Sequence, residues 1–264
     1  MFRIQAPPAD LQHIVRFFWT VRAPAGTVPV ERVIPDGCCE LVWHLADPFR
    51  RRDGVSPDDS QPEAFLFGQL ESAIRLEPLG EVDVLGVRFA PAGVAALWGI
   101  DMSSLGSREF ALDELFPARR RPSIDRLRDT LVFAERCGLV ADYLRSWLRR
   151  TVRVQASRAM AALSLMETPD ADLKDIAREI GCSRRGIERA FRSAVGLSPA
   201  AYLRLQRINR CIQQLRTGAM ELSAIAADAG FADQSHFCRE FRKITGLPPS
   251  AYRSELGQSV SLVP

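Results

Sequence analysis

The chain uses one sequence unit twice. Between residues 173 and 202 the apolar positions recur 49 residues later, and beyond a shared glycine the offset becomes 50. When both the apolar frame and the glycine and proline punctuation recur, one supersecondary unit has been duplicated. Between its glycine and its phenylalanine, each copy differs in almost every polar residue, so we interpret the copies as recognition units. The recurring pairs are Leu173/Leu222, Ile176/Ile225, Ala177/Ala226, Gly181/Gly230, Arg189/Arg239, Phe191/Phe241, Gly196/Gly246, Leu197/Leu247, Pro199/Pro249 and Tyr202/Tyr252.

Length and charge divide the chain into two halves. Its 264 residues suffice for two domains. From Thr151 onward there are 16 Lys and Arg against 11 Asp and Glu, a net +5, whereas the first 150 residues carry 19 against 21, a net −2. A basic half attached to a near-neutral half favours a nucleic-acid-binding domain joined to something else. No apolar run approaches the roughly 20 residues of a membrane span, and Met1–Asp10 lacks a signal-peptide pattern, so we expect a cytoplasmic protein.

The cysteines and histidines offer little catalytic or metal chemistry. The six cysteines are scattered and never spaced Cys-x-x-Cys, which favours reduced structural thiols. A nucleophilic Cys38 or Cys39, as in a redox-sensing or alkylation-sensing protein, remains an alternative, with no supporting constellation around either residue. Only His13 and His44 lie in the first half, not in a ligand-like spacing, so we expect no metal site, no cofactor and no catalytic residue.

The first third of the chain has the pattern of β-strands. Residues 38–45 alternate, with Cys39, Leu41, Trp43 and Leu45 on one face and Cys38, Glu40, Val42 and His44 on the other. Pro35-Asp36-Gly37 predicts a turn before this strand. Further strands are expected at Phe65–Leu70 and Val82–Phe89, an exposed loop at Arg50–Pro62, and a short helix at Pro91–Trp98.

Helical periodicity begins near Leu112. A short helix is expected at Leu112–Phe116, followed by one or two amphipathic helices over Ile124–Arg150 and a domain boundary near Thr151–Gln155. The apolar stripe of the amphipathic region suits either dimerisation or packing on its own domain, and both readings stay open. The stripe consists of Ile124, Leu127, Leu131, Ala134, Leu139, Tyr143 and Trp147.

Each repeat has the layout of a helix-turn-helix. In the first, Asp172 caps a helix through Ile180, Gly181 ends it, and Ser183 caps a second helix over Arg184–Ala194. The second repeat runs over Leu222–Ala229, Gly230, the cap Asp233 and then Gln234–Ile244. One helix, Ala200–Thr217, joins the units and fixes their separation. Successive major-groove faces of DNA lie roughly 34 Å apart, so a stiff spacer suits two reading heads.

The outward residues of the two second helices suit base recognition. Arginine binds guanine O6 and N7 together, and glutamine binds adenine N6 and N7. Other basic residues are placed to neutralise phosphates, which gives affinity without sequence information. The expected base contacts are Arg184, Arg185, Glu188, Arg189, Gln234, Ser235, His236 and Arg239; the expected phosphate contacts are Arg192, Arg204, Arg207, Arg242 and Lys243. A single such unit is as often a packing module with a solvated face, but two capped units with different polar faces favour DNA binding.

From about residue 158 to 256 the chain resembles the DNA-binding domain of AraC-type bacterial transcription regulators. The second repeat carries the motif: Gly230-Phe231, Phe237, Arg239, Phe241-Arg242-Lys243, Gly246, Pro249 and Tyr252-Arg253. The resemblance implies two helix-turn-helix units in adjacent major-groove segments, with the outward residues above at contact positions. Two departures stand out. Asp233 replaces the more usual serine but still caps, and Gly186 lies inside a recognition helix at a cost of about 1 kcal/mol.

The first half resembles, more loosely, the cupin-like sensor domains of the same family, through Ile34-Pro35-Asp36-Gly37 and Gly86-Val87-Arg88-Phe89. Such a domain implies a small-molecule effector and a dimerisation role. The candidate effector pocket consists of Trp43, His44, Phe67, Arg88 and Trp98, although the apolar members also suit an ordinary core, and Arg88 an edge strand facing solvent.

Together these features predict an α+β protein. We expect a β-barrel, cupin-like sensor domain at 1–110, a helical connector at 111–152, an all-α DNA-binding domain at 153–256 and a tail at 257–264. The function predicted is sequence-specific transcription regulation, with promoter DNA, a small-molecule effector, RNA polymerase and a second copy as partners. Two alternatives remain: an effector-independent DNA-binding protein whose first half only dimerises, and an enzyme acting through its β domain.

Overall fold

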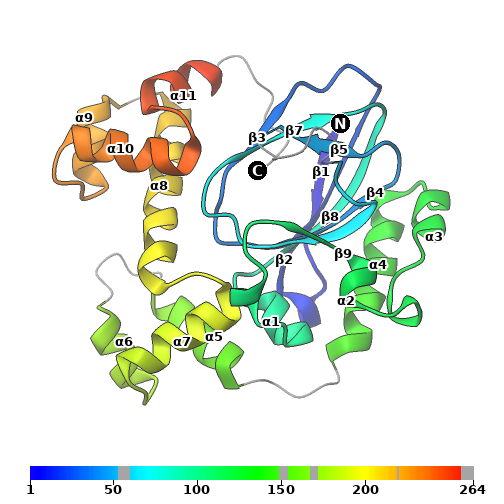
Figure 1. Cartoon of the computed structure of the whole chain (residues 1–264), viewed down its shortest axis with the longest axis horizontal. Coiled ribbons are helices and arrows are strands. Elements are labelled where there is room, and N and C mark those ends of the chain that lie inside the picture. Colours follow the sequence, from blue (N-terminus) through cyan, green and yellow to red (C-terminus); the bar gives the residue numbers. More distant parts are fainter. Residues whose placement is uncertain (53–59, 149–153, 167–171, 219, 257–264) are drawn as a thin grey trace.

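The computed structural model describes residues 1–52, 60–148, 154–166, 172–218 and 220–256 (Figure 1). Most of the predicted loop at 50–62, much of the predicted boundary at 151–155 and the tail at 257–264 lie outside the described residues. The division into domains at the predicted limits therefore stays a prediction. Within the described part, an antiparallel β region is followed by helices, and the predicted α+β class is confirmed.

In the described residues of the first half, the strands form two antiparallel sheets. The larger has the strand order β1-β2-β8-β4-β6-β9 and the smaller the order β3-β7-β5. Val42, Phe65 and Val84 of the larger sheet pack with Phe49 and Ile74 of the smaller one in a shared apolar cluster. The strands are β1 (Phe2–Gln5), β2 (Val15–Ala23), β3 (Glu31–Val33), β4 (Glu40–His44), β5 (Phe49–Arg51), β6 (Ala64–Phe67), β7 (Ile74–Pro78), β8 (Val82–Phe89) and β9 (Glu109–Ala111).

Helices cover the opposite face of the larger sheet. Leu41 and Leu85 of that face belong to one core with Val94 and Val140 of two covering helices. The predicted alternation of β4 is therefore confirmed, because its odd-numbered residues meet the helices and Val42 meets the smaller sheet. The helices of this half are α1 (Gly93–Trp98), α2 (Leu112–Leu115), α3 (Ile124–Asp129) and α4 (Phe133–Leu148), with short 3-10 turns η1 (Ala9–Leu11), η2 (Met102–Ser104) and η3 (Ala118–Arg120).

The predicted apolar stripe of the connector needs correction. Leu131 falls between α3 and α4 and is 69% exposed, so it belongs to neither helix. The buried residues of α4 are instead Phe133, Arg136, Cys137, Val140, Ala141 and Leu144. These residues pack into the core of the first half. Most residues of the predicted stripe, namely Ile124, Leu127, Leu139, Tyr143 and Trp147, pack against the same core, so no second copy is needed to cover them. Arg150 lies outside the described residues.

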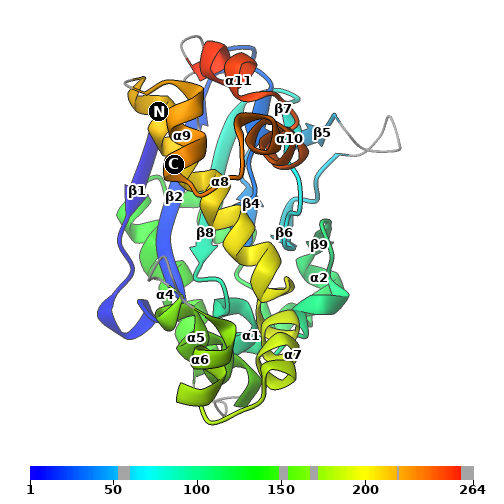
Figure 2. The ribbon, with the colours of Figure 1, turned by 90° about the vertical axis from the view of Figure 1, so that its left-hand side faces the viewer.

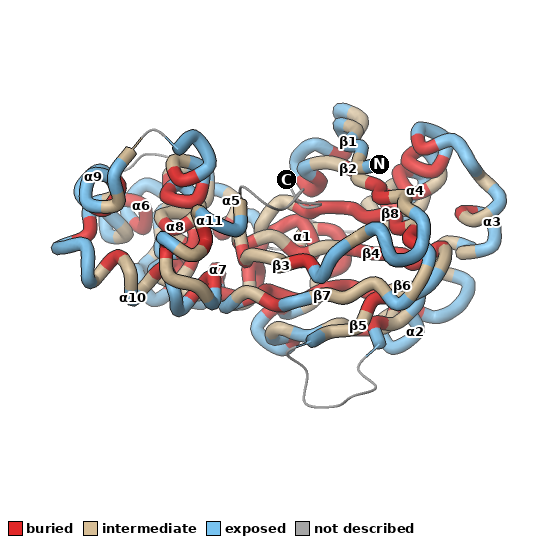
Figure 3. Tube along the Cα trace, turned by 90° about the horizontal axis from the view of Figure 1, so that it is seen from above, coloured by how far each residue is buried: buried red, intermediate tan, exposed pale blue. Residues whose placement is uncertain are grey.

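The second half is helical, and α8 separates its two groups of helices (Figures 1 and 2). One end of α8 contacts α7 and the other contacts α9, α10 and α11. Most buried residues of α7 belong to the same apolar core as those of the first half, whereas the outer side of α9 is exposed (Figure 3). The helices are α5 (Val154–Leu165), α6 (Leu173–Glu179), α7 (Arg184–Val195), α8 (Pro199–Thr217), α9 (Leu222–Asp228), α10 (Gln234–Thr245) and α11 (Pro249–Leu256).

Candidate nucleic-acid interface and internal cavity

Side-chain caps begin three of the four helices of the helix-turn-helix units as predicted. Asp172 Oδ1 accepts from the Lys174 amide at 2.7 Å, Ser183 Oγ from Gly186 at 3.1 Å, and Asp233 Oδ1 from His236 at 2.6 Å. Such caps satisfy amides that have no partner within the helix. The glycines that follow α6 and α9 both have φ of +70°, in the left-handed region that glycine enters without strain.

The outward face of α7 carries three exposed arginines, Arg184, Arg185 and Arg189. Arg184 Nε lies 3.2 Å from Glu188 Oε1, an i,i+4 pair on the helix surface that orders both side chains. Gly186 lies on the buried side of the helix rather than among the polar residues. The exposed face of α7 is therefore strongly basic and contains one carboxylate.

The outward face of α10 differs in chemistry. Gln234, Ser235 and Arg239 are exposed, and His236 is half-buried with its ring edge-on to Phe231 at a centroid distance of 5.4 Å. Beneath them, Phe237 and Phe241 are fully buried, which holds the helix against α8 and α11. The two units thus present different donor and acceptor sets on the same frame, as the repeat predicts.

The predicted phosphate contacts fall into two groups. Arg192, Arg242 and Lys243 are exposed near the ends of α7 and α10. Arg204 Nε instead lies 3.2 Å from Glu240 Oε2, and the Arg207 guanidinium lies 5.5 Å from the centre of the Phe231 ring. These two residues join α8 to the second unit, and any phosphate contact from them adds to that role.

The spacer helix has a length that suits DNA. The 19 residues of α8 extend about 28 Å at 1.5 Å per residue, comparable with the roughly 34 Å helical repeat of DNA. Ser198 caps its start and Gly218 ends it in the left-handed conformation. Because α8 is continuous and packed along one side, the two units are held at a fixed separation.

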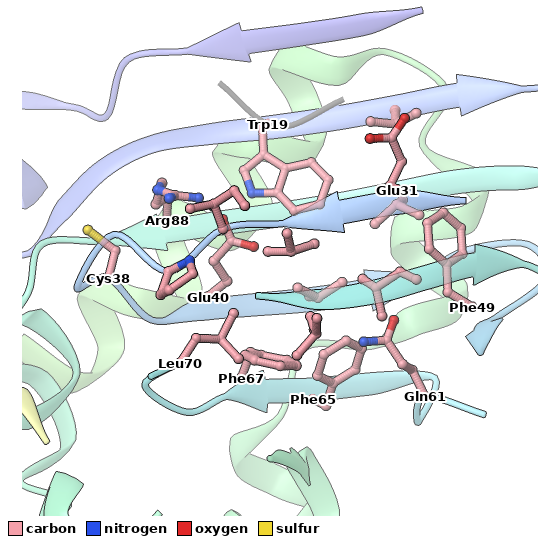
Figure 4. A pocket seen from close by; sticks show the side chains of 18 of the residues that line it. Trp19, Glu31, Cys38, Glu40, Phe49, Gln61, Phe65, Phe67, Leu70 and Arg88 are labelled. Carbon is pink, nitrogen blue, oxygen red and sulfur yellow. The ribbon is translucent and has the colours of Figure 1, made fainter. Parts of the chain in front are cut away.

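A cavity lies between the two sheets (Figure 4), with about 90 Å³ open to the centres of water molecules. Of the predicted pocket residues, His44, Phe67 and Arg88 line it. Trp43 and Trp98 do not, and for these two the prediction is wrong. Trp43 belongs to the opposite face of β4, and Trp98 lies on α1 among Phe89, Phe116 and Trp147. The lining is Trp19, Val21, Glu31, Val33, Ile34, Pro35, Asp36, Cys38, Glu40, Val42, His44, Phe49, Gln61, Phe65, Phe67, Leu70, Ile74, Leu76, Val84 and Arg88.

Arg88 is a buried ion-pair partner rather than a solvent-facing edge residue. The residue is 6% exposed, Nε donates to Asp36 Oδ2 at 3.1 Å, and Nη1 donates to Glu40 Oε1 at 2.5 Å. Burial opposes the charge of Arg88, but the two carboxylates outweigh it and raise the pKa of the guanidinium. The pKa of Asp36 is lowered despite its burial because Arg88 favours its charged form, whereas burial raises the pKa of Glu40.

The proton position of His44 can be assigned from its neighbours. Gln61 Nε2 donates to Glu109 Oε1 at 3.1 Å, which turns the Gln61 oxygen toward His44 Nε2, also at 3.1 Å. His44 Nε2 therefore donates, and Nδ1 keeps its lone pair. Burial lowers the pKa of His44 to about 4, so the ring is neutral at pH 7. Nδ1 is buried without a hydrogen-bond partner in the described part of the chain.

The adjacent cysteines lack the features of a reactive thiol. Burial, with a smaller contribution from Asp36, raises the pKa of Cys38 to about 12, and burial also raises the pKa of Cys39 well above its ordinary value. With these raised pKa values, both thiols stay protonated at neutral pH. Only the thiolate is nucleophilic, so neither side chain is activated. This disfavours the sensor-cysteine alternative.

The turn at one end of the cavity also contacts α8. Asn209 Nδ2 donates to the Pro35 carbonyl at 3.0 Å, and Gln206 Nε2 donates to the Asp36 carbonyl at 2.8 Å. Gly37 has φ of +84°, and a Cβ there would lie 2.7 Å from the Tyr202 ring. The turn of Pro35 and Asp36 therefore borders the cavity on one side and α8 on the other.

Comparisons with known proteins match both halves. Residues 176–255 match the model of a helix-turn-helix domain, and residues 3–111 match that of a domain of unknown function, DUF6597. The chain is 31% identical over 111 residues to the HTH-type transcriptional activator AarP of Providencia stuartii, covering 41% of this chain and 82% of AarP. A solved AraC-type transcriptional regulator from Chromobacterium violaceum is 31% identical, covering 39% of this chain and 96% of that one, with a TM-score of 0.36.

The chain belongs to the AraC family of transcription regulators. It is also 30% identical over 135 residues to the HTH-type transcriptional regulator GbdR of Pseudomonas aeruginosa, across 49% of this chain but only 37% of GbdR. It thus spans well under half of that relative. The family match lies in the helical half, where the predicted repeat lies.

Several residues that shape the cavity of this AraC-family chain had no sequence signal. Glu31 and Gln61 come from a three-residue strand and from the end of a loop, where no periodicity points to a face. Away from the cavity, a further buried residue had no sequence signal: Arg136 is 2% exposed on α4 and donates to both carboxylate oxygens of Asp83, at 2.8 and 3.1 Å. A buried arginine in an apolar helix is visible in sequence only as a break in the stripe.

Among the described residues, no three His, Cys, Asp or Glu side chains come together in a way that could hold a metal ion. Nor does any helix there have the length and apolar character to cross a membrane.

Proposed function

We propose that this AraC-family chain is a sequence-specific DNA-binding transcription regulator whose two recognition helices are α7 and α10. The observation that carries the proposal is the pair of capped helices with different exposed polar faces, held apart by one continuous helix. Polar residues in the first turns of such helices reach base edges in the major groove. Arg189 and Arg239 occupy equivalent positions in the repeat and are both exposed.

The first half of the chain supports a sensing role. A cavity lined by buried polar side chains favours a small-molecule effector over a domain that only dimerises. The turn of Pro35 and Asp36 borders this cavity and accepts hydrogen bonds from α8. A ligand that moves this turn changes how α8, and with it the pair of recognition helices, is held. We propose that this change alters promoter occupancy or contact with RNA polymerase, and that the protein acts in the bacterial cytoplasm.

The proposal assigns the chain no catalytic step. The curated relatives reported above are regulators, and the two nucleophile candidates, Cys38 at the cavity and its neighbour Cys39, have raised pKa values. A homodimer also belongs to the proposal, although most of the apolar stripe of α4 is used within its own half. The effector-independent alternative keeps DNA binding and predicts that no compound binding in the cavity alters it.

Selection of duplexes from a randomised pool by the full-length chain, followed by fluorescence anisotropy, tests the proposal. We expect the selected duplex to bind at least roughly a thousandfold more tightly than a shuffled duplex. Arg189→Ala and Arg239→Ala should each lower this selectivity by roughly 5- to 150-fold, the value of about 1–3 kcal/mol for a bidentate base contact. Arg178→Ala, which removes an exposed arginine from α6, is the matched control and should leave selectivity unchanged within about twofold. Equal binding of selected and shuffled duplexes by the wild-type chain would overturn the proposal.

A further inference from the structure

The charged groups that line the cavity already have partners. Among the described lining residues, the cationic side chain is Arg88, and its guanidinium forms ion pairs with both Asp36 and Glu40. Those two carboxylates are thereby paired as well, and Glu31, the further carboxylate of the lining, is not free either. Within the described lining, a ligand of either sign therefore meets no free counter-charge.

A charged ligand would have to take a partner away from this cluster. An anion that binds Arg88 leaves Asp36 or Glu40 without its cation, and a cation that binds one of these carboxylates weakens its hold on Arg88. Either change leaves a partly buried charge without its partner, which is costly, and the ligand also loses its own hydration on entry. A neutral ligand avoids both costs, so the electrostatics of the cavity select a neutral molecule.

His44 contributes an unpartnered acceptor to the lining. The residue is 2% exposed, and its Nδ1 has no hydrogen-bond partner in the described part of the chain. The relay from Glu109 through Gln61 makes Nε2 the donor of the ring, so Nδ1 is an acceptor. A buried acceptor without a donor is costly, so a ligand with an O–H or N–H group is the complement of this atom.

Most of the remaining wall is apolar, and the volume limits the size of the ligand. Trp19, Phe49, Phe65 and Phe67 surround the space in Figure 4. The centres of the Phe49 and Phe65 rings lie 5.2 and 5.6 Å from that of His44, so the acceptor lies among aromatic side chains. A volume of about 90 Å³ in this measure corresponds to about six to nine water molecules, hence to a ligand with a similar number of non-hydrogen atoms.

We propose that the cavity binds a small, neutral, mostly aromatic molecule that carries one O–H or N–H donor, with His44 Nδ1 as the acceptor. The inference rests on the sensing role proposed above and adds the class of effector, which includes phenols and small aromatic alcohols. Such a molecule leaves the ion pairs of Arg88 intact and places its ring against aromatic side chains, where offset or edge-on packing is favourable. Its donor satisfies the buried acceptor.

The test compares four probes of nearly equal size with the full-length chain by isothermal titration calorimetry at pH 7: p-cresol, anisole, benzylamine and benzoate. p-Cresol and anisole are isomers, but only p-cresol has an O–H donor. At this pH benzylamine is a cation and benzoate an anion. We expect p-cresol to bind at least roughly tenfold more tightly than each of the other three, because anisole leaves Nδ1 without a donor and the other two bring a charge without a free partner.

Each other outcome contradicts part of the proposal. Equal or tighter binding of anisole would overturn the role of His44, and equal or tighter binding of benzylamine or benzoate would overturn the selection of a neutral ligand. Binding of none of the four would overturn the ligand class. DNA selectivity, measured on the same preparation without a probe, separates these outcomes from failure of the proposed function.

Variants locate the acceptor. His44→Phe removes the acceptor and keeps an aromatic ring, so the preference for p-cresol over anisole should fall from at least roughly tenfold to within about twofold. His13→Phe replaces an exposed histidine of the same half that lies outside the lining and is the matched control, with no expected change in this preference. A preference retained in His44→Phe would contradict the assignment of His44. Should this variant fail to fold, as judged by its thermal transition, the ranking of the four probes on the wild-type chain still decides the proposal.

Discussion

The contact between the cavity turn and α8 makes a quantitative prediction about how firmly the two halves are held together. We consider the double variant Gln206→Ala/Asn209→Ala, which removes the two side chains that donate to the carbonyls of Asp36 and Pro35. Each is a neutral hydrogen bond of ordinary length, with a net contribution of about 1 kcal/mol. Their joint loss should cost about 2 kcal/mol, which corresponds to a roughly 30-fold rise in the population with the halves separated.

The Ala73 amide reports this separation directly. It donates to the Ile244 carbonyl at 2.7 Å, a backbone hydrogen bond that joins the first half of the chain to the end of α10. The exchange of a protected amide with solvent requires its hydrogen bond to open, so its rate follows the population of the open state. Hydrogen exchange measured by mass spectrometry or NMR should therefore show exchange at Ala73 accelerated by up to roughly 30-fold in the double variant.

A matched control separates this effect from general loss of helix stability. Gln213→Ala replaces an exposed glutamine of the same helix that faces away from the buried side. It should leave exchange at Ala73 unchanged within about twofold, since an exposed helical Gln→Ala change affects stability by only a few tenths of a kcal/mol. Unchanged exchange in the double variant, or an equal rise in Gln213→Ala, would refute the claim that this turn holds α8.

Three further predictions concern single residues. The pKa of buried His44 is lowered to about 4. Between pH 6.5 and pH 4 the unfolded chain therefore binds a proton at His44 that the folded chain does not. As the pH falls through this range, the free energy of unfolding should decrease by about 3 kcal/mol because of His44. Denaturant unfolding at several pH values should show a flatter acid limb in His44→Phe but not in His13→Phe, and equal slopes in the two variants would contradict this. Gly186→Ala should raise the free energy of unfolding by about 1 kcal/mol, because the new Cβ lies 3.5 Å or more from its neighbours, and a destabilised variant would show that the helix needs the glycine. Arg88→Met should cost about 3–5 kcal/mol at pH 8 by leaving two partly buried carboxylates without a cation. Because those carboxylates then have raised folded-state pKa values, the deficit in unfolding free energy should shrink by pH 5, and a deficit independent of pH would count against the ion pairs.

The helical half could be predicted from the sequence because its signals are local. A capping residue acts on amides two or three positions away, and a terminating glycine acts at its own φ, so Asp172, Ser183 and Asp233 could each be assigned from neighbouring residues. Duplication strengthened every assignment, since an ambiguous position in one copy could be compared with the other. The exposed residues of α7 and α10 followed from the same helical periodicity.

The cavity depended on contacts between distant residues, and the prediction was correspondingly mixed. The alternation of β4 placed His44 and Trp43 on opposite faces, so both could not line one pocket, and the pattern already excluded one of them. Trp98 could not be placed because no local signal tells which face of a sheet a helix covers. Strand β2 escaped notice because a register shift between Val15 and Phe17 interrupts its alternation.

Spacing between the two DNA segments tests the central claim of the account, that two helices on one stiff spacer read DNA together. Anisotropy should be measured with the selected duplex, with a duplex carrying 5 additional base pairs between its two halves, and with one whose second half is scrambled. Five base pairs are about half a helical turn and place the second segment on the opposite side of the DNA, beyond the reach of a spacer of about 28 Å. The account predicts that the insertion lowers affinity to that of the half-scrambled duplex. Full affinity for the duplex with the insertion would contradict it, because the two units would then be reading DNA independently or only one would be reading it.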